Sequence, residues 1–81
     1  MNITYELSHS TYSGYNIIIP RITYISKVGF NNKLKEYYLE IGYDSTEYNE
    51  FIMSFSSEEE AEIKREEIIE IVNQYYSSKK K

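Results

Sequence analysis

Residues 37–55, with the sequence YYLEIGYDSTEYNEFIMSF, decide the fold because they contain two alternating segments joined by a polar turn. In each segment apolar side chains occupy every second position, which is the pattern of a half-buried strand. The stretch therefore predicts a β-hairpin with strands over residues 36–43 and 49–55. A slip of one residue would turn the whole apolar set toward water, so this set fixes the register. The inward side chains are predicted to be Tyr37, Leu39, Ile41, Tyr43, Phe51, Met53 and Phe55.

A capped amphipathic helix is predicted to follow the hairpin, over residues 58–76, with a basic tail over residues 77–81. Ser57 and Glu60 have the spacing of a capping box, and the glutamates at 58–60 complement the positive end of the helix dipole. Glu60 also precedes Lys64 by four residues, which favours an ion pair. The predicted core stripe comprises Ala61, Ile68, Ile69, Ile71, Val72, Tyr75 and Tyr76. The opposite arc comprises Glu59, Glu62, Glu66, Glu67, Glu70, Asn73 and Gln74.

The N-terminal part of the chain is predicted to add three more strands. Residues 2–7 alternate in polarity, and residues 15–19 and 22–28 are rich in β-branched and aromatic side chains. Pro20 separates the last two, because proline cannot donate a hydrogen bond to a ladder. The glycine- and asparagine-containing residues 29–35 are predicted to form a loop. Strands followed by one helix indicate an α+β fold, an antiparallel sheet of four to five strands with one C-terminal amphipathic helix packed on one face.

Length and composition place narrow limits on the chain. With 81 residues there is room for one hydrophobic core, so a single domain over residues 1–81 is expected. The apolar content of 41% is too high for a disordered chain, and the absence of cysteine excludes disulfides and thiol nucleophiles. No apolar run approaches the roughly 20 residues that a membrane-spanning helix needs, and no signal peptide is recognisable. A cytoplasmic protein with no membrane partner is expected.

Charge is distributed unevenly along the sequence. Residues 1–35 carry Glu6 against four basic residues, whereas residues 36–76 carry twelve acidic residues against Lys64 and Arg65. An acidic field of this kind favours a basic partner and disfavours duplex nucleic acid. The acidic half of the chain is therefore where a partner is expected to bind.

The residue types that most enzymes need are scarce, so no enzymatic activity, cofactor or metal is expected. His9 is the single histidine, and together with the lack of cysteine it leaves no common zinc site within the chain. A serine hydrolase would have to use His9, which lies among loop serines and is expected to be solvated. Glu40 is expected to face outward near Glu50 or Ser54, but nothing in the sequence indicates a cleft around them. The glycines are isolated and form no phosphate-binding loop.

Two surfaces are candidates for binding a partner. The first is the outer side of the helix, where Ile63 lies among Glu59, Glu62, Glu66 and Glu70. The alternative is a solvated helix face with one stray apolar residue. The second is the sheet face opposite the helix, onto which Tyr38, Ile52, Ile25 and Ile18 are expected to point, with Tyr12 and Tyr48 in loops. The alternative here is that the N-terminal strands cross over and bury that face.

In size, acidity and lack of catalytic residues the chain resembles the small proteins encoded by phages and mobile elements, some of which inhibit host defence nucleases such as CRISPR effectors. This resemblance covers composition only and implies no particular site residues. It favours a non-catalytic protein-binding module that occupies a basic surface of a host protein.

Two other classes of function stay open at this point. One is an oligomeric protein that holds a small anionic ligand near Arg21, Lys33 and Lys35. The other is a protein that binds single-stranded nucleic acid through tyrosines and these basic residues. A homo-oligomer is compatible with each of these functions.

Overall fold

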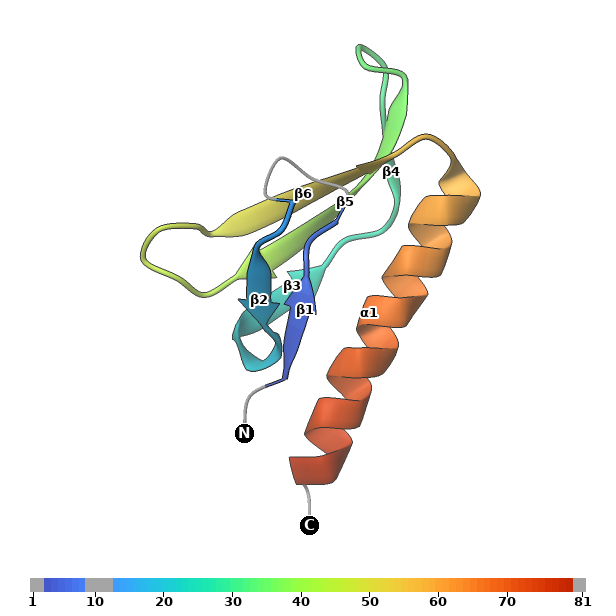
Figure 1. The fold of residues 1–81 in the computed structure, drawn as a ribbon. Helices are drawn as coiled ribbons and strands as arrows, with labels where there is room; N and C mark the ends of the chain where they lie inside the picture. The colour runs from blue at the N-terminus through green and yellow to red at the C-terminus, as the bar shows by residue number, and fades with distance from the viewer. Residues whose placement is uncertain (1–2, 9–12, 80–81) are drawn as a thin grey trace.

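The computed structural model describes residues 3–8 and 13–79 of the chain, with the backbone alone described at Lys79. The predictions for His9, Tyr12 and the last two lysines lie outside the described residues. Figure 1 shows the arrangement of the elements, which are β1 (Thr4–Glu6), β2 (Asn16–Ile18), the 3-10 turn η1 (Ile19–Arg21), β3 (Ile22–Ile25), β4 (Gly29–Asn31), β5 (Glu36–Tyr43), β6 (Glu50–Phe55) and α1 (Glu58–Lys79). The predicted α+β fold with antiparallel sheets and a C-terminal helix is confirmed.

The hairpin predicted from residues 37–55 forms the centre of the molecule. β5 pairs antiparallel with β6 on one side and with both β3 and β4 on the other. Leu39 lies opposite Met53, and Ile41 lies opposite Phe51, in the register that the alternating pattern predicts. All four of these side chains are buried, which confirms the predicted inward face.

The strand β4 corrects the prediction of a loop over residues 29–35. The Asn31 side chain accepts hydrogen bonds from the backbone N–H groups of Lys33 and Leu34, and the turn occupies residues 32–35, three residues later than expected. Lys35 closes the turn with a φ of 56°, in the left-handed region. The three residues before the turn therefore pair with β5 as a short strand.

The N-terminal strands form a sheet of their own, so the described strands make one two-stranded and one four-stranded sheet. Leu7 and Ile17 belong to the same buried cluster as Leu39, Met53 and Ile68. The β1–β2 pair therefore lies on the same face of the larger sheet as α1, where Figure 1 shows it beside the helix. The opposite face of the larger sheet is not buried by these strands, which decides against the crossover alternative.

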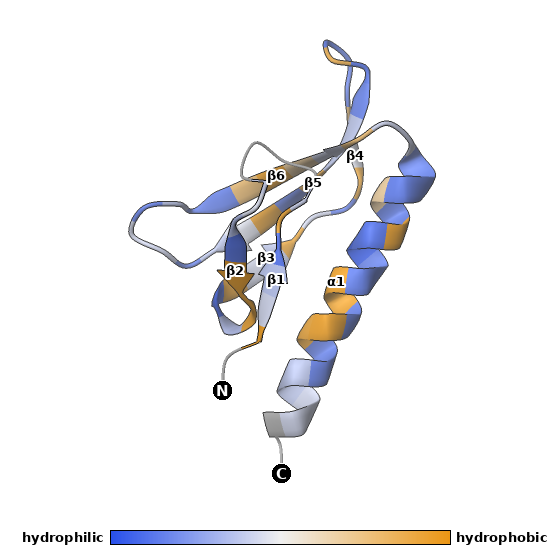
Figure 2. Ribbon diagram, viewed as in Figure 1, coloured by the Kyte–Doolittle hydropathy of each residue, from blue (hydrophilic) through white to orange (hydrophobic). Residues whose placement is uncertain are grey.

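The helix begins as predicted and ends three residues later, at Lys79. The Ser57 hydroxyl oxygen accepts the backbone N–H of Glu60 at 3.2 Å, and the Glu60 carboxylate accepts hydrogen bonds from the hydroxyls of Ser56 and Ser57. Lys64 pairs with Glu67 at 3.0 Å instead of with Glu60. Figure 2 shows hydrophilic residues in the first turn of α1 and hydrophobic ones in its middle turns. Ala61, Ile68 and Tyr75 are buried against the core as predicted, but Tyr76 is exposed.

Candidate protein-binding surfaces

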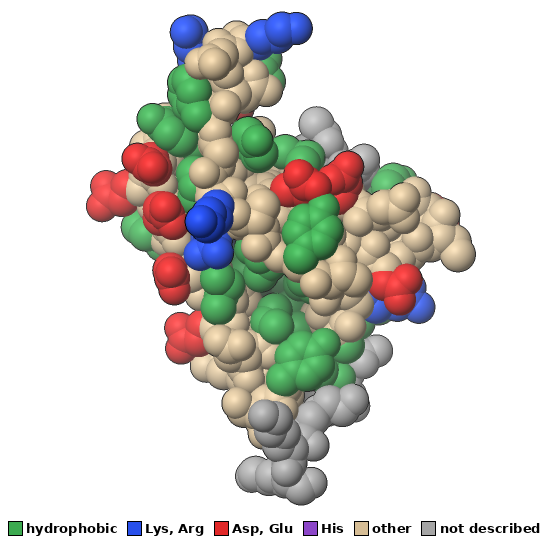
Figure 3. Space-filling view, turned by 180° about the vertical axis from the view of Figure 1, so that it is seen from behind, with side chains coloured by type: hydrophobic (Ala, Val, Ile, Leu, Met, Phe, Trp, Pro, Cys, Tyr) green, Lys and Arg blue, Asp and Glu red, His purple; other side chains and the backbone are tan. Residues whose placement is uncertain are grey.

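The outer side of α1 carries the acidic ridge, which we define as Glu59, Glu62, Glu66 and Glu70. All four side chains are exposed. Ile63, between them, exposes 61% of its surface. Spacings of four and three residues place Ile63 beside Glu59 and Glu66 on a helix surface. Figure 3 shows a row of acidic side chains along α1 on one margin of the molecule. The predicted residues of this surface are therefore all exposed, and two of the four glutamates are direct neighbours of Ile63.

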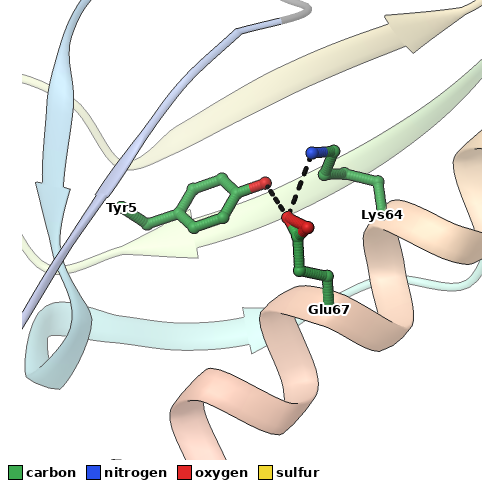
Figure 4. Close-up of polar contacts among 3 residues, drawn as sticks. All are labelled: Tyr5, Lys64 and Glu67. Carbon is green, nitrogen blue, oxygen red and sulfur yellow. Dashed lines mark hydrogen bonds and ion pairs between the residues drawn. The ribbon is translucent and has the colours of Figure 1, made fainter.

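Glu67, which the helical arc groups with these glutamates, has a different role (Figure 4). Its Oε1 atom accepts a hydrogen bond of 2.8 Å from the Tyr5 hydroxyl and pairs with Lys64 Nζ at 3.0 Å. These two contacts, that of Tyr5 first, lower the pKa of Glu67. Glu67 therefore links β1 to α1 and is not part of the acidic ridge.

Two tyrosines lie on the open face of the four-stranded sheet, each across a glycine of the neighbouring strand. Tyr38 lies opposite Gly29, and Tyr24 lies opposite Gly42. A Cβ atom at Gly29 would come within 2.4 Å of the Tyr38 ring, and one at Gly42 would come within 2.1 Å of the Tyr24 ring. An aromatic ring over a glycine shields the sheet backbone where a side chain is missing. Part of the open face is therefore shielded without a second layer of chain.

The tyrosine-bearing face differs in part from the prediction. Tyr38 is half-buried and Ile52 is exposed on this face, as expected. Ile25 faces the core instead, because it lies opposite the buried Ile41. A register shift between Ile22 and Tyr24 puts Tyr24 on the open face in its place. Such a bulge leaves no clear mark in the sequence, so Tyr24 could not be assigned from alternation.

Two more predicted residues have structural contacts of their own. Ile18 is half-buried in β2, a strand of the two-stranded sheet, and its backbone N–H donates to the Tyr43 hydroxyl of β5 at 3.1 Å. The ring of Tyr48 is half-buried and packs 5.7 Å from the ring of Phe51, at the edge of the core. These two positions therefore do not extend the open face.

A hollow of about 580 Å³ lies on the open face beneath the turn between β4 and β5. Its apolar lining includes Phe30, Leu34, Tyr38 and Ile52, and Lys33 lies at its rim. Arg21 is remote from this hollow, because it lies at the opposite end of β5, where it donates to the Asp44 carbonyl oxygen. A strand of eight residues spans roughly 25 Å. The basic residues predicted to share a ligand are thus divided between two ends of the sheet.

Glu40 and Glu50 lie together beside Tyr24 on the open face. The Tyr24 hydroxyl donates a short hydrogen bond to Glu40 Oε2, and this bond raises the pKa of Tyr24 to about 12. Contact with Glu40 raises the pKa of Glu50, while contact with Glu50 and the hydrogen bond from Tyr24 lower the pKa of Glu40. Glu50 is exposed and Glu40 is half-buried, and neither carboxylate lines the hollow beneath the turn between β4 and β5. They form an acidic patch of the surface.

Within residues 3–8 and 13–79, no group of three or more histidine, cysteine, aspartate or glutamate residues could hold a metal ion. The same part of the chain contains no helix that is long and apolar enough to cross a membrane. No protein-family model, curated protein or solved structure matches the chain. Functional proposals therefore rest on the surfaces described above.

Proposed function

We propose that this protein is a non-catalytic binding module that occupies a basic surface of another protein through the acidic ridge and Ile63. The observation that carries this proposal is the 61% exposure of Ile63 among carboxylates. Burying an isoleucine side chain in an interface contributes about 1.5–3 kcal/mol, and the carboxylates attract and orient a positively charged partner. An apolar centre with a charged rim is the usual composition of a protein interface.

The class of partner follows from the charge of the ridge. Proteins that bind nucleic acid present basic surfaces to phosphates, and four carboxylates on one helix face compete for such surfaces. The resemblance in composition to phage and mobile-element proteins favours a host defence protein as the target. We therefore propose an inhibitor that acts in the cytoplasm by covering a nucleic-acid-binding surface.

The test compares two variants with the same change in net charge. Glu59→Lys/Glu62→Lys reverses two of the four charges of the ridge, whereas Glu6→Lys/Glu47→Lys reverses two exposed glutamates elsewhere. Tagged wild-type and variant proteins are used to capture partners from the host, and the captured proteins are quantified by mass spectrometry. We expect a basic protein that the wild type and the control variant retain and that the ridge variant loses. Equal retention of this protein by both variants would show that the ridge does not contribute to its binding.

A second candidate function draws on a separate feature, the hollow lined by Phe30, Tyr38 and Ile52. The Tyr38 ring with the apolar side chains of Leu34 and Ile52 suits a ligand with a flat ring, including a base of single-stranded nucleic acid, and Lys33 and Glu36 both line the hollow. Titration with a labelled single-stranded oligonucleotide at low salt tests this candidate. It requires a change in anisotropy that Lys33→Glu removes, and a flat titration would contradict it.

A further inference from the structure

An apolar groove of about 410 Å³, separate from the hollow beside Tyr38, lies between β3 and the C-terminal half of α1. Ile22, Ile25, Ile69 and Val72 line it, and the rings of Tyr24 and Tyr76 stand beside it, exposing 47% and 45% of their surfaces. The groove is open, so it suits an extended occupant better than an enclosed small molecule. Figure 3 shows hydrophobic side chains on this side of the molecule, between the acidic side chains of α1 and a second acidic group over the sheet.

One wall of the groove is the outer edge of β3, at which Ile25 is the residue whose peptide groups point away from β5. Tyr24 pairs with Gly42, and the Ser26 N–H donates to the Glu40 carbonyl oxygen at 2.9 Å. In an antiparallel ladder alternate residues direct their peptide groups to opposite sides, so Ile25 directs its N–H and C=O away from β5. Within residues 3–8 and 13–79, β5 is the only strand that pairs with β3. An extended segment could therefore bond to this edge as an added strand.

Both sides of the groove are acidic. On the helix side, Ile69 separates the groove from Glu66 and Glu70. On the sheet side, Glu40 accepts the hydrogen bond from Tyr24, and Glu50 lies beside Glu40. A second copy of this chain would bring its own carboxylates against these, and like charges in an interface oppose association. The charges therefore favour a basic partner over self-association through this edge.

At one end of the groove the basic side chains outnumber the acidic ones. Arg65 Nε donates to the Ser26 carbonyl oxygen at 2.8 Å, and Lys27 and Glu62 line the same hollow as Arg65. These cations lie beyond the Ile25 end of β3. Lysine and arginine side chains of an occupant are therefore expected along the groove and not at this end.

We propose that the groove binds an extended segment of the basic partner as an added strand on β3. Its apolar side chains would enter the groove, and its lysine or arginine side chains would reach the carboxylates on the two sides. This inference rests on the proposed function, which supplies a basic partner, and it names a second contact site that neither Glu59 nor Glu62 lines. The occupant is a peptide segment that alternates apolar and basic residues.

The test uses a synthetic peptide of alternating lysine and valine with blocked ends, titrated into the full-length ¹⁵N-labelled protein and followed by NMR. We expect the largest amide shifts at Ile25, with further shifts at Ile69 and Val72. The same peptide with methylated backbone nitrogens keeps its charge but cannot donate to a strand edge, and it should bind at least tenfold more weakly. Equal binding of the methylated peptide, or no shift at millimolar peptide, would overturn the proposal.

A pair of variants separates this inference from the proposed function. Tyr76→Lys places a cation at the exposed groove wall, and Ser77→Lys adds the same charge at the next exposed position of the helix. We expect Tyr76→Lys to weaken peptide binding at least fivefold relative to Ser77→Lys. Peptide binding lost in Glu59→Lys/Glu62→Lys but kept in Tyr76→Lys would contradict the groove and leave the ridge proposal standing. The reverse pattern would support the groove without the ridge.

Discussion

At Gly42 and Gly29 the lack of a side chain is what allows two tyrosines to lie across the open sheet face. The Tyr24 ring occupies the space that a Cβ atom at Gly42 would need, and Tyr38 does the same at Gly29. In the sequence, Gly42 occupies an outward position of the alternating pattern, and Gly29 is expected to begin a loop. Their pairing with tyrosines depends on the register of three strands, one of which contains a bulge. The pairing therefore becomes visible only when the strands are placed together.

Gly42→Ala tests the contact between the Tyr24 ring and Gly42. In a strand alanine is ordinarily more favourable than glycine by about 0.5–1 kcal/mol, because glycine loses more backbone entropy on folding. Here the added Cβ would displace the Tyr24 ring and crowd the Thr23 hydroxyl, so we expect a net loss of about 1–2 kcal/mol in the free energy of unfolding. In a Tyr24→Ala background the loss should shrink by about 1 kcal/mol. Urea unfolding of the four proteins measures it, and equal losses in both backgrounds would contradict the contact.

Among the elements, β5, β6 and α1 could be predicted from the sequence because their periodic patterns extend over six residues or more. The shorter strands were harder to delimit. A strand of three residues has too short a pattern to fix its boundaries. The prediction missed β4 because its last residue, Asn31, is of a type that favours turns and caps the turn that follows. The attachment of β1 to α1 through Tyr5 and Glu67 joins residues 62 positions apart, and no local pattern indicates it.

The contact between Tyr5 of β1 and Glu67 of α1 predicts that the free energy of unfolding depends on pH. Contacts with Tyr5 and Lys64 lower the pKa of Glu67 in the folded protein. A lowered pKa means that the stabilisation is present above the unfolded value of about 4.5 and is lost as pH falls through the folded pKa. Because Glu67 is exposed, this stabilisation is limited to about 0.5 kcal/mol.

Glu67→Gln should therefore be less stable than wild type at pH 7, and the difference should disappear under acidic conditions. Glu62→Gln is the matched control, because it removes one charge from the exposed side of the same helix. Thermal unfolding across this pH range measures the effect. An identical pH profile for both variants would show that the Tyr5–Glu67 contact adds no stability.

For the whole molecule, the main feature is that α1 and the β1–β2 pair share one face of the larger sheet. Chain length and the order of strands and helix predicted the fold class. They did not decide which face the N-terminal strands would cover, since either face could accept Leu7 and Ile17. The consequence for function is that three surfaces stay outside the core: the acidic ridge, the hollow beside Tyr38 and the groove along β3.

The proposal that the acidic ridge binds a basic protein surface can be tested on the captured partner. Titration calorimetry at low and high salt gives the dissociation constant of this partner for wild type and for Glu59→Lys/Glu62→Lys. We expect the ridge variant to bind at least tenfold more weakly at low salt, and the gap to narrow at high salt because screening weakens the attraction of the wild type. Equal dissociation constants for the two proteins at low salt would contradict the claim.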